Sequence, residues 1–125
     1  MEPTHMAKIL LVEDNEMNRD ILSRHLKRRG FDFVLADNGN QAVELAGSEQ
    51  PDLILMDMNL PVKDGWTAVA EIKASSATSE IPVIALTAYA SEQDREKALA
   101  AGCDEHQVKP FRAIDLFDKI ETLLP

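Results

Sequence analysis

The sequence predicts a single α/β domain built on a five-stranded parallel sheet, with helices on both faces. Short apolar runs alternate five times with longer amphipathic stretches, which indicates five β-α units. Three of those apolar runs are nearly continuous, as in parallel strands that helices cover on both sides. The length of 125 residues suits one domain with its own core.

The apolar runs place the predicted strands at residues 8–12, 33–36, 53–56, 83–87 and 105–108. Connections of the observed length between parallel strands are right-handed, which makes the sheet doubly wound. The compact five-stranded version of this fold, the flavodoxin-like one, has the strand order 2-1-3-4-5. In such sheets ligands bind beyond the carboxyl ends of the strands, where the order reverses between strands one and three.

Five helices are predicted between and after these strands. The first covers residues 16–29 and stops at Gly30, and the second covers residues 40–47. A third starts near Trp66 and is soon broken by a serine- and threonine-rich stretch. The fourth is capped by Ser91 and ends at Gly102. The last carries an apolar stripe that we expect to be core: Ile114, Leu116, Phe117, Ile120, Leu123 and Leu124.

Composition limits the function classes. The chain is 45% hydrophobic and 28% charged, which is typical of a folded domain. A net charge of −9 argues against binding to nucleic acid or to an anionic membrane, and favours a cation or a basic partner. The lone Cys103 cannot form an internal disulfide, and no apolar run approaches a membrane span. We expect a cytoplasmic domain over residues 7–125, with residues 1–6 a disordered leader or an expression remnant.

Polar residues follow the predicted strands at one rim of the sheet. Strand one is followed by Glu13 and Asp14, strand three by Asp57 and strand five by Lys109, and Thr87 ends strand four. Three carboxylates this close repel unless a cation neutralises them. Magnesium suits the site best, because it binds one or two carboxylates together with water and phosphate oxygens.

A carboxylate beside a bound magnesium ion can act as a nucleophile toward an activated phosphoryl group. Such transfer depends on positioning and on neutralising charge at the phosphoryl oxygens. Lys109 supplies a compact positive charge and Thr87 a hydroxyl donor. Singly, each of these residues reads as an ordinary turn or cap residue, but their joint occurrence on successive strands predicts that Asp57 is a phosphoryl acceptor.

Four stretches resemble the receiver domain of two-component response regulators, and the resemblance extends from about Lys8 to Leu124. They are Ile-Leu-Leu-Val-Glu-Asp-Asn, Asp-Leu-Ile-Leu-Met-Asp-Met-Asn-Leu-Pro, Val-Ile-Ala-Leu-Thr-Ala-Tyr-Ala and Val-Lys-Pro-Phe. The resemblance implies that Asp57 receives its phosphoryl group from a sensor histidine kinase, a histidine phosphotransfer protein or a small phosphodonor. It also implies that Mg²⁺ binds Glu13, Asp14, Asp57 and the backbone carbonyl of Asn59.

The resemblance further implies a conformational switch made of Thr87 and Tyr89, which alters a protein-binding surface on the fourth helix, fifth strand and fifth helix. It implies a cis peptide bond between Lys109 and Pro110, although a trans proline in a simple turn fits the sequence equally. One departure concerns the start of the last helix, where Arg112 and Ala113 have poor capping chemistry. A domain of this kind catalyses only its own phosphorylation and dephosphorylation and is otherwise not an enzyme.

Two other classes of protein fit the sequence less well than this switch. An aspartyl-nucleophile phosphohydrolase needs a second Asp two residues after the nucleophile, where this chain has Asn59. A flavin binder needs a hydroxyl-rich phosphate loop after strand one, where this chain has Glu13, Asp14 and Asn15. The switch hypothesis is therefore favoured, either as a stand-alone regulator or as a receiver module from a hybrid histidine kinase or larger response regulator.

Overall fold

The computed structural model describes residues 7–88 and 92–124, which form five parallel strands in one sheet. The strand order is β2-β1-β3-β4-β5, as predicted. The chain alternates strand and helix throughout: β1 (Lys8–Val12), α1 (Glu16–Arg28), β2 (Asp32–Ala36), α2 (Gly39–Glu49), β3 (Leu53–Asp57), α3 (Gly65–Ala74), β4 (Val83–Thr87), α4 (Glu92–Ala101), β5 (Glu105–Val108) and α5 (Ala113–Leu123).

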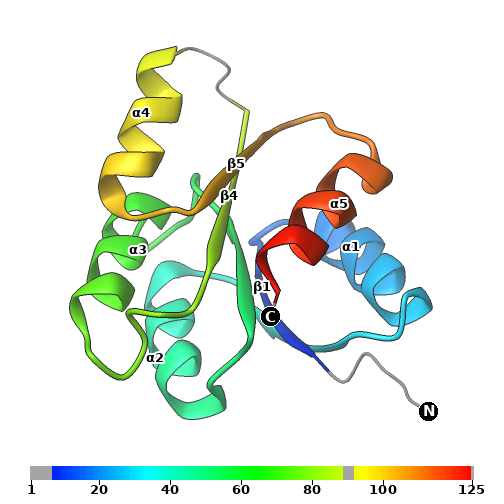
Figure 1. The fold of residues 1–125 in the computed structure, drawn as a ribbon, viewed down its shortest axis with the longest axis horizontal. Helices are drawn as coiled ribbons and strands as arrows, with labels where there is room; N and C mark the ends of the chain where they lie inside the picture. The colour runs from blue at the N-terminus through cyan, green and yellow to red at the C-terminus, as the bar shows by residue number, and fades with distance from the viewer. Residues whose placement is uncertain (1–6, 89–91, 125) are drawn as a thin grey trace.

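Helices cover both faces of the sheet, so the core has two halves. Helices α1 and α5 pack on one face, and α2, α3 and α4 pack on the other (Figure 1). Side chains alternate between the faces along each strand. On β1, Ile9 and Leu11 face α1 and α5, whereas Leu10 and Val12 face the other three helices.

Strand burial follows strand position. Every residue of β3 and β4 is buried, and so are four of the five residues of β1. The edge strands β2 and β5 are only partly buried. The three central strands are therefore the continuous apolar runs from which the sheet was predicted.

Helix α2 differs from its prediction at both ends. It begins at Gly39 rather than residue 40, because the Asn38 side chain caps it by accepting a 2.9 Å hydrogen bond from the Gln41 amide. It also continues past Gly47 to Glu49 and ends at Gln50, whose φ of 47° is left-handed. A glycine alone does not end a helix, and here a glutamine takes the left-handed position.

The other helix ends lie close to their predicted positions. Helix α1 ends at Arg28, followed by Gly30 with a φ of 85°, and α4 ends at Ala101, followed by Gly102 with a φ of 112°. Helix α3 is capped by Asp64, whose side chain accepts a 2.7 Å bond from the Thr67 amide. The predicted cap of α4, Ser91, lies outside the described residues.

Helix α5 confirms the weak cap and the apolar stripe except at Ile114, which was expected in the core and lies outside it. Leu116, Phe117 and Ile120 are buried in the core, while Ile114 is 55% exposed. The N-cap residue Arg112 makes no side-chain cap hydrogen bond and instead pairs with Asp115 at 3.1 Å.

Helices α3 and α4 are joined by a cation-π contact. The Lys97 ammonium group of α4 lies 4.1 Å from the ring centroid of Trp66 on α3. Trp66 is the single tryptophan of the chain. Its environment therefore depends directly on where α4 lies.

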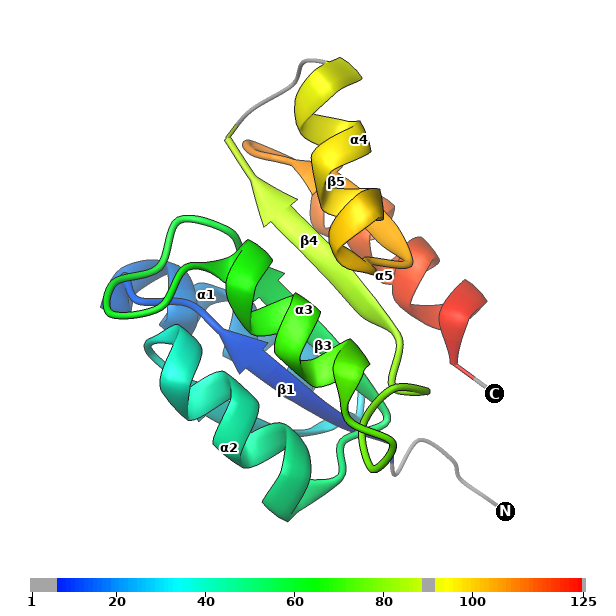
Figure 2. The same cartoon turned by 90° about the vertical axis from the view of Figure 1, so that its left-hand side faces the viewer.

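The two ends of the described chain lie at the amino ends of the strands. The chain enters at β1 and leaves after α5, which runs back against the strand direction, so both ends lie opposite the carboxyl rim (Figure 2). Among the described residues, no helix has the length and apolar character needed to cross a membrane.

Candidate functional site

The predicted site residues are held by backbone hydrogen bonds that continue the sheet beyond its strands. The Glu13 amide donates to the Ala36 carbonyl at 3.0 Å, and the Lys109 amide donates to the Thr87 carbonyl at 2.7 Å. Asp57 is the last residue of β3. The site therefore sits on rigid elements rather than on a mobile loop.

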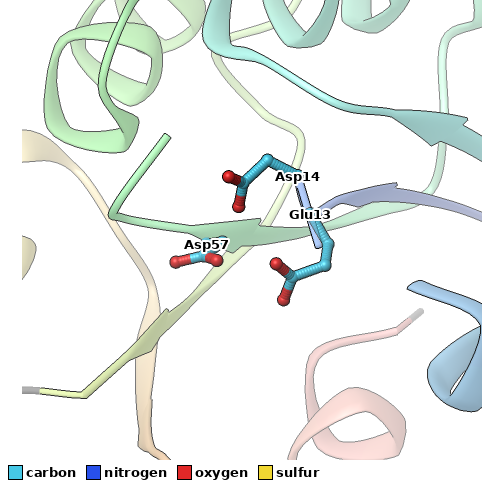
Figure 3. Close-up of side chains that lie close together, drawn as sticks. All are labelled: Glu13, Asp14 and Asp57. Carbon is cyan, nitrogen blue, oxygen red and sulfur yellow. The ribbon is translucent and has the colours of Figure 1, made fainter. Parts of the chain in front are cut away.

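Three carboxylates meet at the carboxyl rim, as their strand positions indicated. Glu13, Asp14 and Asp57 each place one oxygen within 4.8 Å of the others (Figure 3). Glu13 is 1% exposed and Asp57 is 5% exposed, whereas Asp14 is exposed to solvent. Two of the three carboxylates are thus buried away from water. Repulsion between like charges is stronger in this environment than in solvent.

Lys109 bridges the two buried carboxylates. Its Nζ lies 3.2 Å from Glu13 Oε1 and 3.1 Å from Asp57 Oδ2. Burial of the ammonium group by itself lowers the pKa of Lys109, but the charges of Asp57 and Glu13 outweigh it and raise that pKa above its ordinary value. Lys109 therefore remains a cation inside the site.

Glu13 holds its proton more tightly than an ordinary glutamate. Burial is the main cause, the nearby Asp57 carboxylate adds to it, and together they raise the pKa of Glu13 to about 7. The Asn15 amide, which donates to Glu13 Oε2 at 3.1 Å, opposes this rise. Near pH 7 Glu13 is therefore only partly ionised, which reduces but does not remove the excess of negative charge over the single lysine.

The remaining oxygen of Asp57 is held by the chain that follows it. The Asn59 amide donates to Asp57 Oδ1 at 3.0 Å, while Lys109 holds Oδ2. Both carboxylate oxygens are therefore fixed, and the group has one orientation at the end of β3.

The donor set suits a hard divalent cation. Its three carboxylates supply oxygen ligands, and magnesium prefers oxygen to nitrogen or sulfur. A bound divalent cation would also offset the charge that Lys109 leaves uncompensated. The residues present therefore fit a metal ion of this class.

Of the two predicted switch residues, the structure describes only Thr87. Thr87 is buried at the end of β4. Tyr89 lies outside the described residues. The peptide bond between Lys109 and Pro110 is cis.

The structure points to one further residue, His106, that the sequence analysis did not single out. His106 of β5 lies opposite Ala85 of β4, so it shares a sheet face with Thr87, two residues along. It is 8% exposed, and its Nε2 has no hydrogen-bond partner among the described residues. Its position three residues before Lys109 was visible in the sequence, but its burial was not.

A groove of about 500 Å³ opens beside the site. Glu13 and Lys109 are among the residues that line it, and its walls are mostly apolar, with Ile21, Leu22 and Phe111 among them. Ile21 on α1 is 48% exposed. The groove therefore adjoins the carboxylate cluster at Glu13.

Known proteins match this chain over nearly its whole length. The family model described as the response regulator receiver domain matches residues 9–121. The receiver domain of a sensor histidine kinase from Pseudomonas aeruginosa, solved with a magnesium ion in its active-site cleft, is 40% identical with a TM-score of 0.88, covering 94% of this chain and 97% of that one. The chemotaxis protein CheY4 of Vibrio cholerae is 29% identical with a TM-score of 0.89, covering 95% and 99%.

The chain belongs to the response regulator receiver domain family, whose members are signalling switches rather than classical enzymes. Hybrid signal transduction histidine kinase G of Dictyostelium discoideum is 43% identical over 116 residues, which are 90% of this chain. The chain spans only 3% of the length of that relative. Receiver domains of hybrid kinases and of response regulators take phosphoryl groups from histidine kinases or phosphotransfer proteins.

Proposed function

We propose that Asp57 accepts a phosphoryl group from a phosphohistidine and that the domain thereby changes its protein-binding surface. The observation that carries this proposal is the Asp57 carboxylate, which is buried, fixed at both oxygens and bridged by Lys109 to Glu13. A carboxylate used only as a turn or cap residue needs no such surroundings. The arrangement resembles that of an activated nucleophile.

In the transfer, one oxygen of Asp57 attacks the phosphorus atom of the donor. The bond from phosphorus to the donor's histidine nitrogen breaks, and that nitrogen leaves with the electron pair while an acyl phosphate forms on Asp57. Lys109, already 3.1 Å from Asp57 Oδ2, compensates the negative charge of the phosphoryl oxygens. The Asn59 amide orients the attacking carboxylate through its bond to Oδ1.

Glu13, Asp14, Asp57 and the Asn59 carbonyl are the residues that would hold magnesium. When bound, the ion supplies positive charge against the carboxylates and the transferred phosphoryl group. The magnesium ion in the receiver domain of the P. aeruginosa kinase supports this assignment. Asp14 is the one of the three carboxylates that is exposed to solvent.

The donor is either a sensor histidine kinase or a histidine phosphotransfer protein in the cytoplasm. Support comes from the family and from the groove of about 500 Å³, whose apolar walls lead to Lys109. The changed surface is proposed to lie on α4, β5 and α5. Thr87 starts the change, and two aromatic residues are candidates for passing it on: Tyr89, predicted from the sequence, and His106, indicated by its place on the face of Thr87.

The experiment that tests this function is phosphorylation with acetyl phosphate and Mg²⁺, followed by intact-protein mass spectrometry. We expect a mass gain of one phosphoryl group in the wild-type protein and none in Asp57→Asn. Asp52→Asn is the matched control, because Asp52 is an exposed aspartate just before β3, at the opposite end from the site. A gain that persists in Asp57→Asn would refute the assignment of the acceptor.

A further inference from the structure

The loop that joins β3 to α3 carries Asn59, and it is held against the first turn of α2. Both segments lie at the carboxyl rim of the sheet (Figure 2). The contact is made at Gly39, a buried glycine that is the first residue of α2. A methyl group at this position would overlap the Lys63 carbonyl oxygen and lie 2.7 Å from the Lys63 carbonyl carbon.

The loop has little freedom to move away from such a methyl group. The Lys63 amide donates a 2.7 Å hydrogen bond to the Pro61 carbonyl, which closes a tight turn around Val62. The Lys63 side chain pairs with Glu71 of α3 at 2.6 Å. At the far end, the Gly65 amide donates to the Met58 carbonyl at 3.0 Å. A displacement at Lys63 is therefore passed along the loop toward Asn59.

The second glycine, Gly65, closes the loop on the acceptor strand. A side chain there would lie 2.6 Å from the Asp57 carbonyl oxygen and 2.6 Å from Met58 Cα. Both neighbours are backbone atoms, which cannot turn aside as a flexible side chain would. The two glycines thus fix the segment from Asp57 to Gly65 from both sides.

We infer that Gly39 is a positioning residue of the metal site, which acts through the loop it supports rather than by touching the ion. This inference rests on the proposed function, in which the Asn59 carbonyl is a magnesium ligand. Magnesium demands near-octahedral geometry with short bonds, so a small displacement of one ligand weakens binding. Residues that orient ligands from behind typically change metal affinity 10- to 100-fold when they are altered.

A matched pair of glycines in α2 separates this role from ordinary helix propensity. Glycine to alanine inside a helix normally favours the helix. Gly47 has no atom within 4 Å of the position its Cβ would take, so Gly47→Ala adds only propensity. Gly39→Ala adds the same methyl group against the loop backbone. The two variants therefore differ in the contact with Lys63 and not in the chemistry of the substitution.

The experiment is a calorimetric titration of Mg²⁺ into the wild-type protein, Gly39→Ala and Gly47→Ala. We expect Gly39→Ala to bind about tenfold more weakly or worse, and Gly47→Ala to bind like the wild type. In metal-free Gly39→Ala, the Asn59 amide should also exchange with solvent faster, because its bond to Asp57 Oδ1 is disturbed. Equal affinity in all three proteins would overturn the inference while leaving the proposed function intact.

A measurement on the wild-type protein covers the case in which Gly39→Ala does not fold. Saturating Mg²⁺ should shift the amide resonances of Gly39 and Lys63 and leave that of Gly47 unmoved. Unmoved Gly39 and Lys63 resonances in a protein that binds magnesium would overturn the inference. A wild-type protein that binds no magnesium would refute both the proposed metal site and the role of Gly39.

Discussion

At the scale of single residues, Val62 is the most unusual position beside the site. It has a φ of 69° and is 78% exposed. A β-branched residue rarely adopts a positive φ, and such strain costs about 1–3 kcal/mol. Most of the Val62 side chain lies in solvent, so its own packing does not hold this φ. The contacts of the loop at Gly39 and Gly65 hold it instead.

Replacing Val62 by glycine should therefore stabilise the protein. Glycine adopts a positive φ freely, although its more flexible unfolded chain offsets part of the gain. We expect a net increase of about 1 kcal/mol in the free energy of unfolding, which urea denaturation would measure.

Ala77→Gly is the control for that substitution. Ala77 is also exposed in a loop, but it is not among the residues with positive φ. Glycine there brings only the entropic cost, so we expect a loss of about 0.5–1 kcal/mol. If Val62→Gly were destabilised as much as Ala77→Gly, the backbone strain at Val62 would make no significant contribution to the free energy of unfolding.

The carboxylates of the site and Lys109 were predictable from the sequence, whereas Gly39 and His106, which lie behind the site, were not. Glu13, Asp14 and Asp57 follow strands whose order is fixed by general topology, so their meeting needed no knowledge of contacts. Gly39 is different, because its importance comes from the Lys63 backbone, 24 positions away in the chain. His106 is also different, because polarity alone favoured an exposed residue on an edge strand, and only packing shows that it is buried.

At the scale of elements, the register between β4 and β5 places Thr87 and His106 on the same face of the sheet. Ala85 pairs with His106 and Thr87 pairs with Val108. A movement of Thr87 toward a phosphoryl group would vacate space on the face where His106 is buried. The two strands would thus pass a local change at Asp57 to α4, which packs on that face through Ala98.

Thr87→Ala should accept the phosphoryl group but fail to transmit the change. Without the hydroxyl, we expect phosphorylation to be retained at Asp57, while the emission of Trp66 stays as in the unphosphorylated protein. Trp66 is a suitable reporter, because Lys97 of α4 lies 4.1 Å from its ring centroid. The measurement is fluorescence before and after acetyl phosphate with Mg²⁺.

Two further variants decide which aromatic residue relays the change. If His106 is the relay, His106→Ala blocks the change at Trp66 and Tyr89→Ala leaves it intact. The reverse result would favour Tyr89. Should phosphorylated Thr87→Ala still change Trp66 emission as the wild type does, the proposed route through Thr87 would be wrong.

The elements themselves were predictable to within a few residues, and the ends of α2 needed more than a local signal. Apolar runs and helical periodicity determine the strands and the faces of α1 and α5, and these signals are local. The ends of α2 depend instead on the Asn38 cap and on the left-handed Gln50. The helix continues past its predicted end at residue 47, because a helix ends where the backbone turns left-handed and the carbonyls find other partners.

At the scale of the whole molecule, the excess of negative charge should make folding depend on divalent cations. The net charge is −9, and three of the carboxylates converge within 4.8 Å with one lysine between two of them. A cation that binds only the folded state stabilises it by mass action. At a Mg²⁺ concentration ten times the Kd, we expect about 1.4 kcal/mol of added stability, or about 5 °C in Tm.

Thermal denaturation with and without Mg²⁺ measures this effect, and NaCl at matched ionic strength is the control. General screening of surface charge is the same in both salts, so the additional shift reports site binding. Asp14→Ala should reduce that additional shift, because it removes one of the three oxygen ligands. Equal shifts in the two salts would contradict a specific site.

The position of the two chain ends has a consequence for how such a domain is built into proteins. Both ends of the described chain lie at the amino ends of the strands (Figure 2), and the carboxylate cluster lies at the carboxyl ends. Sequence attached before β1 or after α5 therefore starts on the side away from Asp57. The same domain can therefore form part of chains of very different length. In each of them the carboxyl rim with Asp57 would stay accessible to the partner that is proposed to supply the phosphoryl group.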